Sequence, residues 1–281
     1  MNIINKIEEM QKISAQIKKS GKTIVLVPTM GYLHEGHLSL VRIGQKVCDI
    51  VIVSIFVNPT QFGPAEDLDS YPKDLERDCA LLKKEGVETV FAPASEELYP
   101  AGYQTYVNTL KLSEHLCGIS RPALFQGVTT VLTKLFNIVN PDKAVFGKKD
   151  FQQFVIVSRM VKDLNFNIEI IGAPIIREAD GLAMSSRNAY LKKNQRDSAL
   201  SLYKALKKAE NLVKKGEKKA EVIINAASKL INSFDEILID YISICDFEFF
   251  EEVKIIDRPV LMALAVKAGR TRLIDNIILF Q

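Results

Sequence analysis

Tryptophan is absent from the 281-residue sequence, and histidine and cysteine are scarce, with three and four residues respectively. The cysteines lie far apart, form no CxxC pair and have mostly apolar or helical neighbours. This pattern is typical of free thiols in a reducing compartment and not of a disulfide framework. We therefore predict a cytoplasmic protein.

Long apolar runs and a strong charge of one sign are missing as well. The longest apolar run, residues 50–57, includes a serine and is far shorter than the roughly 18 residues that a membrane span requires. The first 22 residues place Ile and Met at helical spacing among Lys, Glu and Gln, without the apolar core of a signal peptide. The net charge is only +3, which does not argue for nucleic acid or a membrane as a partner. We expect neither.

Strand-like and helix-like segments alternate through the first 175 residues. The strand-like segments are rich in Val and Ile and lie at residues 23–28, 49–59, 88–93, 143–147 and 167–174. Helical patterns follow them, after a first helix near the N-terminus, at residues 34–47, 73–85, 128–140 and 150–165. The run at 49–59 is almost unbroken Val and Ile, as in strands that are covered on both faces of a parallel sheet. This alternation predicts βαβ units and a doubly wound, Rossmann-like α/β domain over residues 1–175.

The pattern changes near Pro174. Residues 192–233 have a lysine-rich helical periodicity, and short strand-like segments then follow one another at 237–246, 247–255, 259–269 and 271–279. Helices followed by consecutive strands predict a smaller α+β domain, with a mostly antiparallel sheet, over residues 176–281. The lysines between positions 206 and 219 are expected to form a solvated helix face.

The first polar cluster is VPTMGYLHEGHLSL, which leaves a predicted strand, passes through a glycine turn and enters a predicted helix. Ligands of open α/β sheets bind at such positions, where the next helix offers unpaired N–H groups to phosphate. His34 and His37 are three residues apart, so both can meet a bound triphosphate from one helix face. Two other interpretations stay open. The histidines could hold a metal, although HEGH lacks the HExxH spacing, or they could simply cap the helix.

The second cluster, FVNPTQFG, follows the next buried strand. The amides of Asn58 and Gln61 suit hydroxyl and carboxylate groups, although such residues also form ordinary turns. The acidic residues that follow could hold Mg²⁺ directly or through water, or could simply be solvated. They are Glu66, Asp67, Asp69, Asp74 and Asp78.

The third and fourth clusters are FGKKDFQQF and IREADGLAMSSRNAYL. In the third, two lysines can neutralise phosphate, Asp150 can cap a helix or bind ribose or Mg²⁺, and either Gln152 or Gln153 should face the pocket. In the fourth, two serines and an arginine after a glycine loop can clamp phosphate oxygens. Each is weak singly, but four such clusters near the ends of predicted strands indicate a nucleotide site.

Together these residues resemble the pantothenate synthetase (pantoate-beta-alanine ligase) family of the HIGH-motif nucleotidyltransferase superfamily. The matching stretches are PTMGYLHEGH, FVNPTQF with the following DLDSYP, FQGVTTVLTKLFNIV, FGKKDFQQ and DGLAMSSRNAYL. They span about residues 23–191, and the resemblance thins after about residue 200. HxGH alone would indicate only the superfamily, whereas the whole set points to this one family.

The resemblance implies an AMP-forming ligase. ATP and (R)-pantoate would give pantoyl adenylate and pyrophosphate, and the amine of beta-alanine would then attack the acyl group to give pantothenate and AMP. The resemblance also implies Mg²⁺ with the ATP, a homodimer, and a small C-terminal domain that closes over ATP as a lid.

Residue roles follow from the resemblance by motif. His37 would be the proton donor, acting on the phosphates with His34 and Lys149. Gln61 and Gln153 would bind pantoate, with Gln61 also near beta-alanine and Asn58 grouped with them, and Asp78 would be a Mg²⁺ ligand. The ATP-binding residues would be Met30, Gly31, Tyr32, Leu33, His34, Glu35, Gly36, His37, Gly147, Lys148, Lys149, Asp150, Ile176, Met184, Ser185, Ser186 and Arg187.

Some positions depart from the family pattern. Lys148 stands where Glu is common, Ala123 and Leu124 where Gly-His is common, and Lys73 where Arg is common. Lys73 keeps the charge but cannot form a bidentate fork. Two other functions stay open: a nucleotidyltransferase that acts on a phosphorylated acceptor, and a nucleotide-binding module without catalysis. The amides of Asn58, Gln61 and Gln153 favour a small hydroxy acid over a phosphate, which would call for more arginines.

Overall fold

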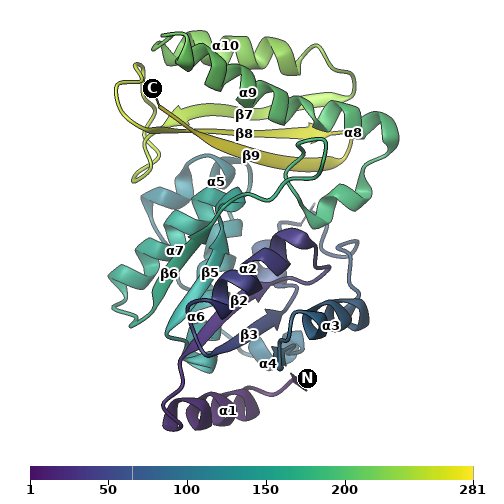
Figure 1. The fold of residues 1–281 in the computed structure, drawn as a ribbon, viewed down its shortest axis with the longest axis vertical. Coiled ribbons are helices and arrows are strands. Elements are labelled where there is room, and N and C mark those ends of the chain that lie inside the picture. Colours follow the sequence, from purple (N-terminus) through teal and green to yellow (C-terminus); the bar gives the residue numbers. More distant parts are fainter. Residues whose placement is uncertain (65, 281) are drawn as a thin grey trace.

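The structure is a computed structural model that describes residues 1–64 and 66–280. It contains a six-stranded parallel sheet in the order β1-β4-β3-β2-β5-β6 and a three-stranded antiparallel sheet in the order β7-β8-β9 (Figure 1). The predicted fold class, a doubly wound parallel sheet with a smaller C-terminal α+β part, is confirmed. No helix among the described residues is long and apolar enough to cross a membrane.

The parallel sheet is built from the N-terminal part of the chain. Its strands are β1 (Asn2–Ile4), β2 (Ile24–Thr29), β3 (Ile50–Ile55), β4 (Thr89–Phe91), β5 (Lys143–Gly147) and β6 (Glu169–Ala173). Its helices are α1 (Ile7–Lys19), α2 (Glu35–Gln45), α3 (Leu75–Lys84), α4 (Ser95–Leu98), α5 (Cys117–Ser120), α6 (Leu124–Val139) and α7 (Phe151–Asp163). Short 3₁₀ turns are η1 (Pro59–Gln61), η2 (Lys111–Glu114) and η3 (Lys148–Asp150).

Both faces of this sheet are covered, which explains the unbroken apolar runs in its strands. Ile24 and Leu26 of β2 pack in one core with residues of α1, α6 and α7. Val25 and Val27 point to the other face, into a core shared with α2 and α3. Alternate residues of one strand therefore enter different cores, as the period of two along a strand requires.

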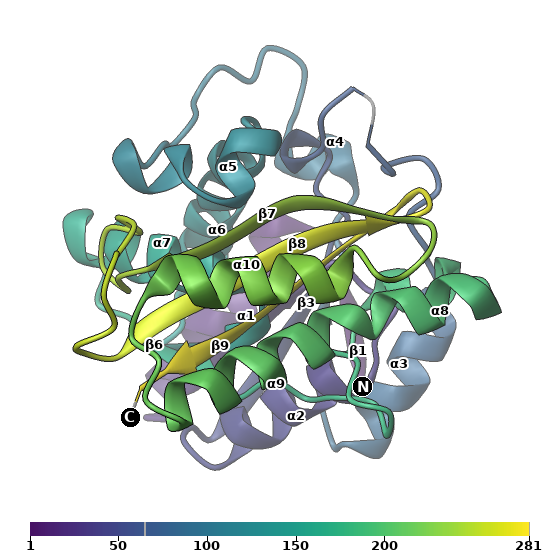
Figure 2. The same cartoon turned by 90° about the horizontal axis from the view of Figure 1, so that it is seen from above.

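The C-terminal part places helices over the antiparallel sheet (Figure 2). It contains η4 (Ser186–Tyr190), α8 (Lys193–Ala199), α9 (Ser201–Lys214), α10 (Ala220–Ile231), β7 (Ile237–Cys245), β8 (Val260–Ala268) and β9 (Thr271–Leu279). Met262 and Leu264 of β8 pack against α9 and α10. Leu261 and Ala263 point the other way and join the core of the N-terminal part. One face of the antiparallel sheet therefore packs against α9 and α10, and the other makes apolar contacts with the N-terminal part.

The stretch 192–233 is helical, as predicted, and divides into three helices. Two local predictions were wrong. Asn2–Ile4 is a strand that pairs in parallel with β4, and not part of the first helix. Residues 247–255 form no strand, because the carboxylate of Asp246 accepts the N–H groups of Glu248, Phe249 and Glu251 and closes a turn there. The cysteines are free thiols, as predicted.

Candidate active site

A pocket lies where the carboxyl ends of β2, β3 and β5 meet the C-terminal sheet. These three strands are neighbours, and the chain leaves β2 toward β3 on one side while β5 pairs on the other. Such a reversal of strand order is where open α/β sheets bind ligands. Residues of β8 and β9 line the opposite wall, so both parts of the chain contribute to one pocket.

The HEGH turn joins β2 to α2 and faces this pocket. Its backbone passes through positive φ at Gly31 (+83°) and Tyr32 (+51°). His34 is the N-cap of α2, and its Nδ1 accepts the Gly36 N–H at 3.1 Å. The Nδ1 of His37 accepts the His34 N–H at 3.3 Å, and the two ring centroids are 4.0 Å apart. Because each Nδ1 is an acceptor, the proton of each neutral imidazole must be on Nε2.

Both imidazoles are neutral near pH 7 in the absence of a ligand. Burial, followed by the positive charge of Lys149, lowers the pKa of His34 to about 4. Burial, together with His34 and Lys149, lowers the pKa of His37 well below its ordinary value. Each ring lines the pocket and retains one Nε2–H donor. The helix-capping interpretation is therefore compatible with ligand binding, since capping uses only Nδ1.

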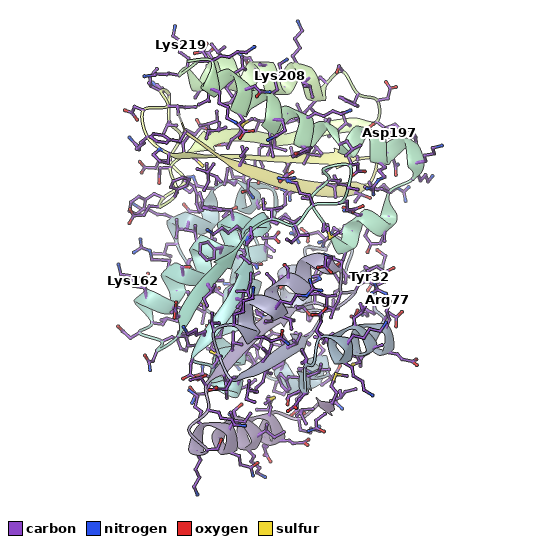
Figure 3. The ribbon with its side chains drawn as sticks, in the orientation of Figure 1. Tyr32, Arg77, Lys162, Asp197, Lys208 and Lys219 are labelled. Carbon is purple, nitrogen blue, oxygen red and sulfur yellow. The ribbon has the colours of Figure 1, made fainter. Side chains whose placement is uncertain are left out.

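The carboxylate of Asp78 holds the backbone of this turn in place. Its two carboxylate oxygens accept the N–H groups of Tyr32 and Leu33, each at 2.7 Å. Burial raises the pKa of Asp78, against the opposing effect of these hydrogen bonds. The Arg77 guanidinium donates to the Leu33 carbonyl at 3.0 Å and lies 5.0 Å from the centre of the Tyr32 ring (Figure 3). Asp78 does not line the pocket, and its oxygens are already used.

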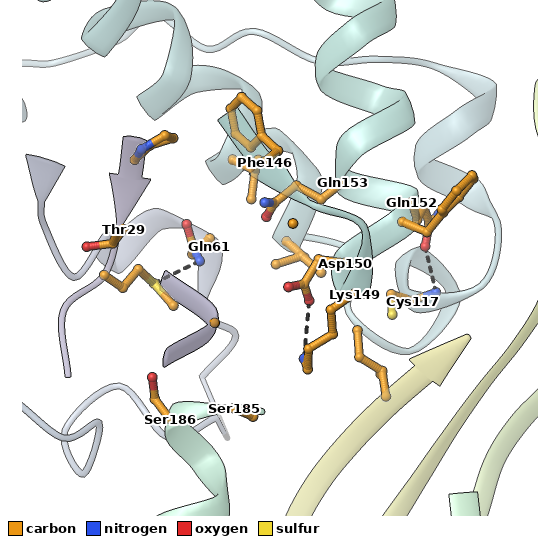
Figure 4. Close-up of a pocket in the computed structure, with 18 of the residues that line it drawn as sticks. Thr29, Gln61, Cys117, Phe146, Lys149, Asp150, Gln152, Gln153, Ser185 and Ser186 are labelled. Atoms are coloured by element: carbon orange, nitrogen blue, oxygen red, sulfur yellow. Dashed lines mark hydrogen bonds and ion pairs between the residues drawn. The ribbon is translucent and has the colours of Figure 1, made fainter. Parts of the chain in front are cut away.

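Asn58 fixes the position of Gln61 after β3. Its Nδ2 donates to the Gly127 carbonyl at 3.0 Å and to Gln61 Oε1 at 3.1 Å, while its Oδ1 accepts the Tyr99 hydroxyl at 2.9 Å. Asn58 is buried, with an exposed fraction of 1%. The Nε2 of Gln61 donates to the Met30 sulfur at 3.0 Å. The amide hydrogens of Asn58 are therefore committed to the protein, whereas the Nε2 of Gln61 donates only weakly, to sulfur (Figure 4).

Gly127 allows α6 to approach this turn closely. A Cβ at position 127 would lie 2.5 Å from the Cα and backbone nitrogen of Gln61. We expect Gly127→Ala to cost about 1–3 kcal/mol of unfolding free energy, the usual range for overpacking, and to raise the KM for any substrate that binds beside Gln61. Urea unfolding and steady-state kinetics measure the two effects. Gly63→Ala is the matched control, since its nearest neighbour is a side-chain atom 3.6 Å away. Wild-type stability and KM in Gly127→Ala would contradict this account.

The two adjacent glutamines of α7 have different environments, although both line the pocket. The amide of Gln152 accepts the Cys117 N–H at 3.0 Å and donates to the carbonyls of Leu112 and His115 at 2.9 and 2.7 Å. The side-chain amide of Gln153 has no hydrogen bond to any other residue that the structure describes, and it lies in the pocket (Figure 4). Gln152 therefore holds the neighbouring loop, while Gln153 is available to a ligand.

Lys149 is the pocket-facing member of the lysine pair. Its Nζ lies 3.7 Å from Asp150 Oδ1, and its side chain is 19% exposed (Figure 4). Lys148 does not line the pocket, and its Nζ lies 5.9 Å from the centre of the Phe154 ring instead. Lys149 thus supplies positive charge beside the two histidines.

The MSSRN segment closes the pocket above the HEGH turn. Ser186 Oγ donates to the Tyr32 carbonyl at 3.1 Å. The Arg187 guanidinium binds both oxygens of Asp67, at 2.9 and 3.0 Å, and lies over the Tyr71 ring. Arg187 thus already forms a bidentate ion pair with a carboxylate. The same guanidinium fork can bind two oxygens of a phosphate group.

The structure brings most of the predicted site residues into one pocket. Those that line it are Met30, His34, Gly36, His37, Asn58, Gln61, Gly147, Lys149, Asp150, Gln153, Ile176, Met184, Ser185, Ser186 and Arg187. Those outside its lining are Gly31, Tyr32, Leu33, Glu35, Asp78 and Lys148. The first three shape the turn through the backbone, and Glu35 is exposed and pairs with Arg42.

The pocket also contains residues that the sequence patterns did not single out, namely Cys117, Arg121, Tyr241, Arg272, Asp275 and Asn276. The sequence did contain a signal for Asp275 and Asn276, because this polar pair interrupts the apolar strand TRLIDNIIL. Polar groups in a buried strand require hydrogen-bond partners, which indicates a contact with another part of the chain.

Comparison with known proteins gives a consistent result over the whole chain. The model of the family described as pantoate-beta-alanine ligase matches residues 2–278. The pantothenate synthetase of Thermotoga petrophila is 57% identical over 279 residues, which are 99% of this chain and 100% of that protein. The crystal structure of pantothenate synthetase from Thermus thermophilus is 40% identical, with a TM-score of 0.95 and full coverage of both chains. The pantoate-beta-alanine ligase of Francisella tularensis, crystallised with beta-gamma ATP and beta-alanine, is 33% identical, with a TM-score of 0.82 and coverage of 99% and 97%.

Proposed function

The chain belongs to the pantoate-beta-alanine ligase family, and from this premise we propose that the pocket between its two sheets carries out both half-reactions. The enzyme joins pantoate to beta-alanine with the use of ATP. In the first step, a carboxylate oxygen of pantoate bonds to the α-phosphorus of ATP, and the bond to pyrophosphate breaks. In the second, the beta-alanine nitrogen bonds to the acyl carbon, AMP leaves with the bonding electrons, and the amine loses a proton.

The first step needs alignment and charge stabilisation and no protein nucleophile. The Nε2–H groups of His34 and His37 and the ammonium of Lys149 all face the pocket beside the N-terminus of α2. We assign them to the phosphate oxygens that gain negative charge as pyrophosphate leaves. Neutral imidazoles suit this role, because each donates a hydrogen bond from Nε2–H without first gaining a proton, and nearby phosphate raises their pKa toward protonation.

The free amides carry the assignment of the acceptor site. The side-chain amide of Gln153 has no protein partner within the described chain, and Gln61, whose Oε1 accepts from Asn58, donates from Nε2 only to a sulfur. The pocket's arginines are already paired with carboxylates: Arg121 with Glu66, Arg187 with Asp67 and Arg272 with Asp240. Free amides and occupied guanidinium groups favour a small hydroxy acid over a phosphorylated acceptor.

The decisive experiment measures AMP and pyrophosphate release from ATP. Pantoate alone should give a burst of pyrophosphate and bound adenylate, and addition of beta-alanine should give sustained AMP release. A phosphorylated acceptor in place of pantoate should give neither product. Absence of AMP with both acids present would overturn the ligase assignment.

Magnesium enters this proposal with the nucleotide. Among residues 1–64 and 66–280, no group of three His, Cys, Asp or Glu side chains could hold a metal. Mg²⁺ usually keeps waters and binds through one or two carboxylates plus substrate phosphates, and Asp150 is a carboxylate that lines the pocket beside Lys149. Bound Mg²⁺ would neutralise phosphate charge. We propose Asp150 for this contact in place of Asp78, whose oxygens hold the HEGH turn.

Loss of the free amide tests the pantoate site. We expect Gln153→Ala to raise the KM for pantoate by about 10- to 100-fold, as expected when hydrogen bonds to a charged group are lost, with little change in the KM for ATP. Steady-state pyrophosphate release against each substrate measures this. Gln126→Ala, on the exposed face of α6, is the matched control. A defect confined to ATP would contradict the assignment.

The division of the chain and its assembly complete the proposal. We propose a nucleotide- and pantoate-binding domain at residues 1–175 and a lid domain at 176–281, supported by their separate sheets. We also propose a cytoplasmic homodimer, for which the mass in solution is the test.

A further inference from the structure

Strand β9 is the part of the C-terminal sheet that contacts the KKD turn, η3 (Lys148–Asp150). It pairs with β8 along one edge, and three of its polar residues, Arg272, Asp275 and Asn276, line the pocket. Figure 1 shows β9 as the strand of this sheet nearest the parallel sheet. A polar pair at this position needs partners outside its own sheet.

Asn276 binds the backbone of the KKD turn. Its Nδ2 donates to the carbonyl oxygens of Lys148 and Lys149 at 3.0 and 2.9 Å, and the residue is 7% exposed. A primary amide nitrogen carries two hydrogens, and here both are used. The two acceptors are consecutive carbonyls of η3, the short turn whose side chains include the pocket lysine. A side chain with only one donor hydrogen, or with none, cannot make both of these hydrogen bonds.

Asp275 makes a parallel contact with the other wall of the pocket. Both of its oxygens accept from Arg177, at 2.6 and 3.0 Å, and Arg177 also donates to the Gly181 carbonyl. Arg177 lies at the start of the loop that bridges to Ala183 and leads into MSSRN. Two consecutive residues of one strand therefore hold the two segments predicted to contact the triphosphate.

We propose that Asn276 is a positioning residue for adenylate formation, which fixes the KKD turn so that Lys149 points at the nucleotide phosphates. The proposal rests on the function assigned above. Asn276 does not touch the reacting atoms. It acts by limiting rotation of the two peptide groups that carry the lysine, and it links the C-terminal sheet to the first half-reaction.

The test compares Asn276→Ala, which removes both donors, with Asn276→Asp, which keeps the shape but presents oxygens to the two carbonyls. We expect the rate constant of the pyrophosphate burst with ATP and pantoate to fall about 10- to 100-fold, the effect of a misplacement of roughly 1 Å in a catalytic group. The KM for beta-alanine should stay within about twofold of wild type. The matched control is Asn232→Ala, an exposed asparagine of the same domain whose side-chain amide donates to the Ser228 hydroxyl.

A spectroscopic measurement separates positioning from general destabilisation. Because the charge of Lys149 lowers the pKa of His34, displacement of that lysine should raise the pKa of this imidazole, as read by NMR titration of the ring protons. Asn232→Ala should leave it unchanged. If Asn276→Ala does not fold, Asn276→Asp is read in the same two assays.

Two results would overturn the proposal. One is a folded Asn276 variant with a wild-type burst rate constant and an unchanged His34 titration, and the other is a defect confined to the KM for beta-alanine. If wild-type protein itself releases no pyrophosphate, that result counts against the proposed function, and the His34 titration still decides the role of Asn276.

Discussion

Replacement of His37 by alanine is expected to lower kcat for pyrophosphate release by about two to three orders of magnitude, the range for loss of a donor that stabilises transition-state charge. The structure gives the reason. His37 lines the pocket, its Nδ1 is occupied by the His34 N–H, and its Nε2–H is left for the proposed contact with the phosphates. The KM for pantoate should change little, because the bond to phosphate strengthens only as charge develops.

The control for His37→Ala is His115→Ala. His115 is the third histidine of the chain and does not line the pocket. Circular dichroism and thermal unfolding should show that His37→Ala is folded, since removal of the ring affects one capping contact at the start of α2. Full activity in a folded His37→Ala would remove this residue from the mechanism. Activity in His37→Asn well above that of His37→Ala would show that a neutral donor suffices.

Replacement of Lys149 by methionine is the second change with a large expected effect. It keeps the length of the side chain and removes the positive charge beside the phosphates. We expect kcat to fall by about two orders of magnitude or more, as for loss of one electrostatic contact in a water-excluded site. The KM for ATP should rise as well, because the lysine also attracts the nucleotide in the ground state.

The same variant has an effect on the histidines that can be measured without substrate. Lys149 contributes to the lowered pKa of both His34 and His37. Its removal should raise both pKa values, although burial continues to hold them below the ordinary value. NMR titration measures the shift, and Lys162→Met, on α7 outside the pocket lining, is the control. An unchanged titration with lost activity would mean that Lys149 acts on the nucleotide from a different position.

The sequence predicted the site more fully than it predicted the chain's C-terminal part, and the reason is spatial. Parallel strands end at the same edge of a sheet, so the clusters after β2, β3 and β5 must lie together once the fold class is known. Local sequence signals were enough to predict that His34, Gln61 and Lys149 lie at this pocket. The contact between Asn276 and the Lys149 carbonyl joins residues 127 positions apart, and periodicity along a strand carries no information about such a partner.

Short or irregular elements were missed for a related reason. β1 has three residues, and its pairing with β4 depends on a neighbour formed nearly 90 positions later. The segment 247–255 has strand-like composition, but the Asp246 carboxylate gathers three N–H groups and turns the chain. A side chain that accepts backbone N–H groups offers the chain an alternative to sheet pairing, so a strand-like composition alone does not decide which of the two forms.

The apolar inner face of the C-terminal sheet limits how this part of the molecule can move. Leu261, Ala263 and Cys245 belong to the same core as α6 and α7, and the ring centroids of Phe151 and Phe247 are 6.0 Å apart. A wide swing away from the parallel sheet would expose this surface to water at a cost of about 25 cal/mol per Å². Small sliding motions keep the contact dry. Nucleotide entry and product release are therefore better served by shear of one layer over the other than by an opening hinge.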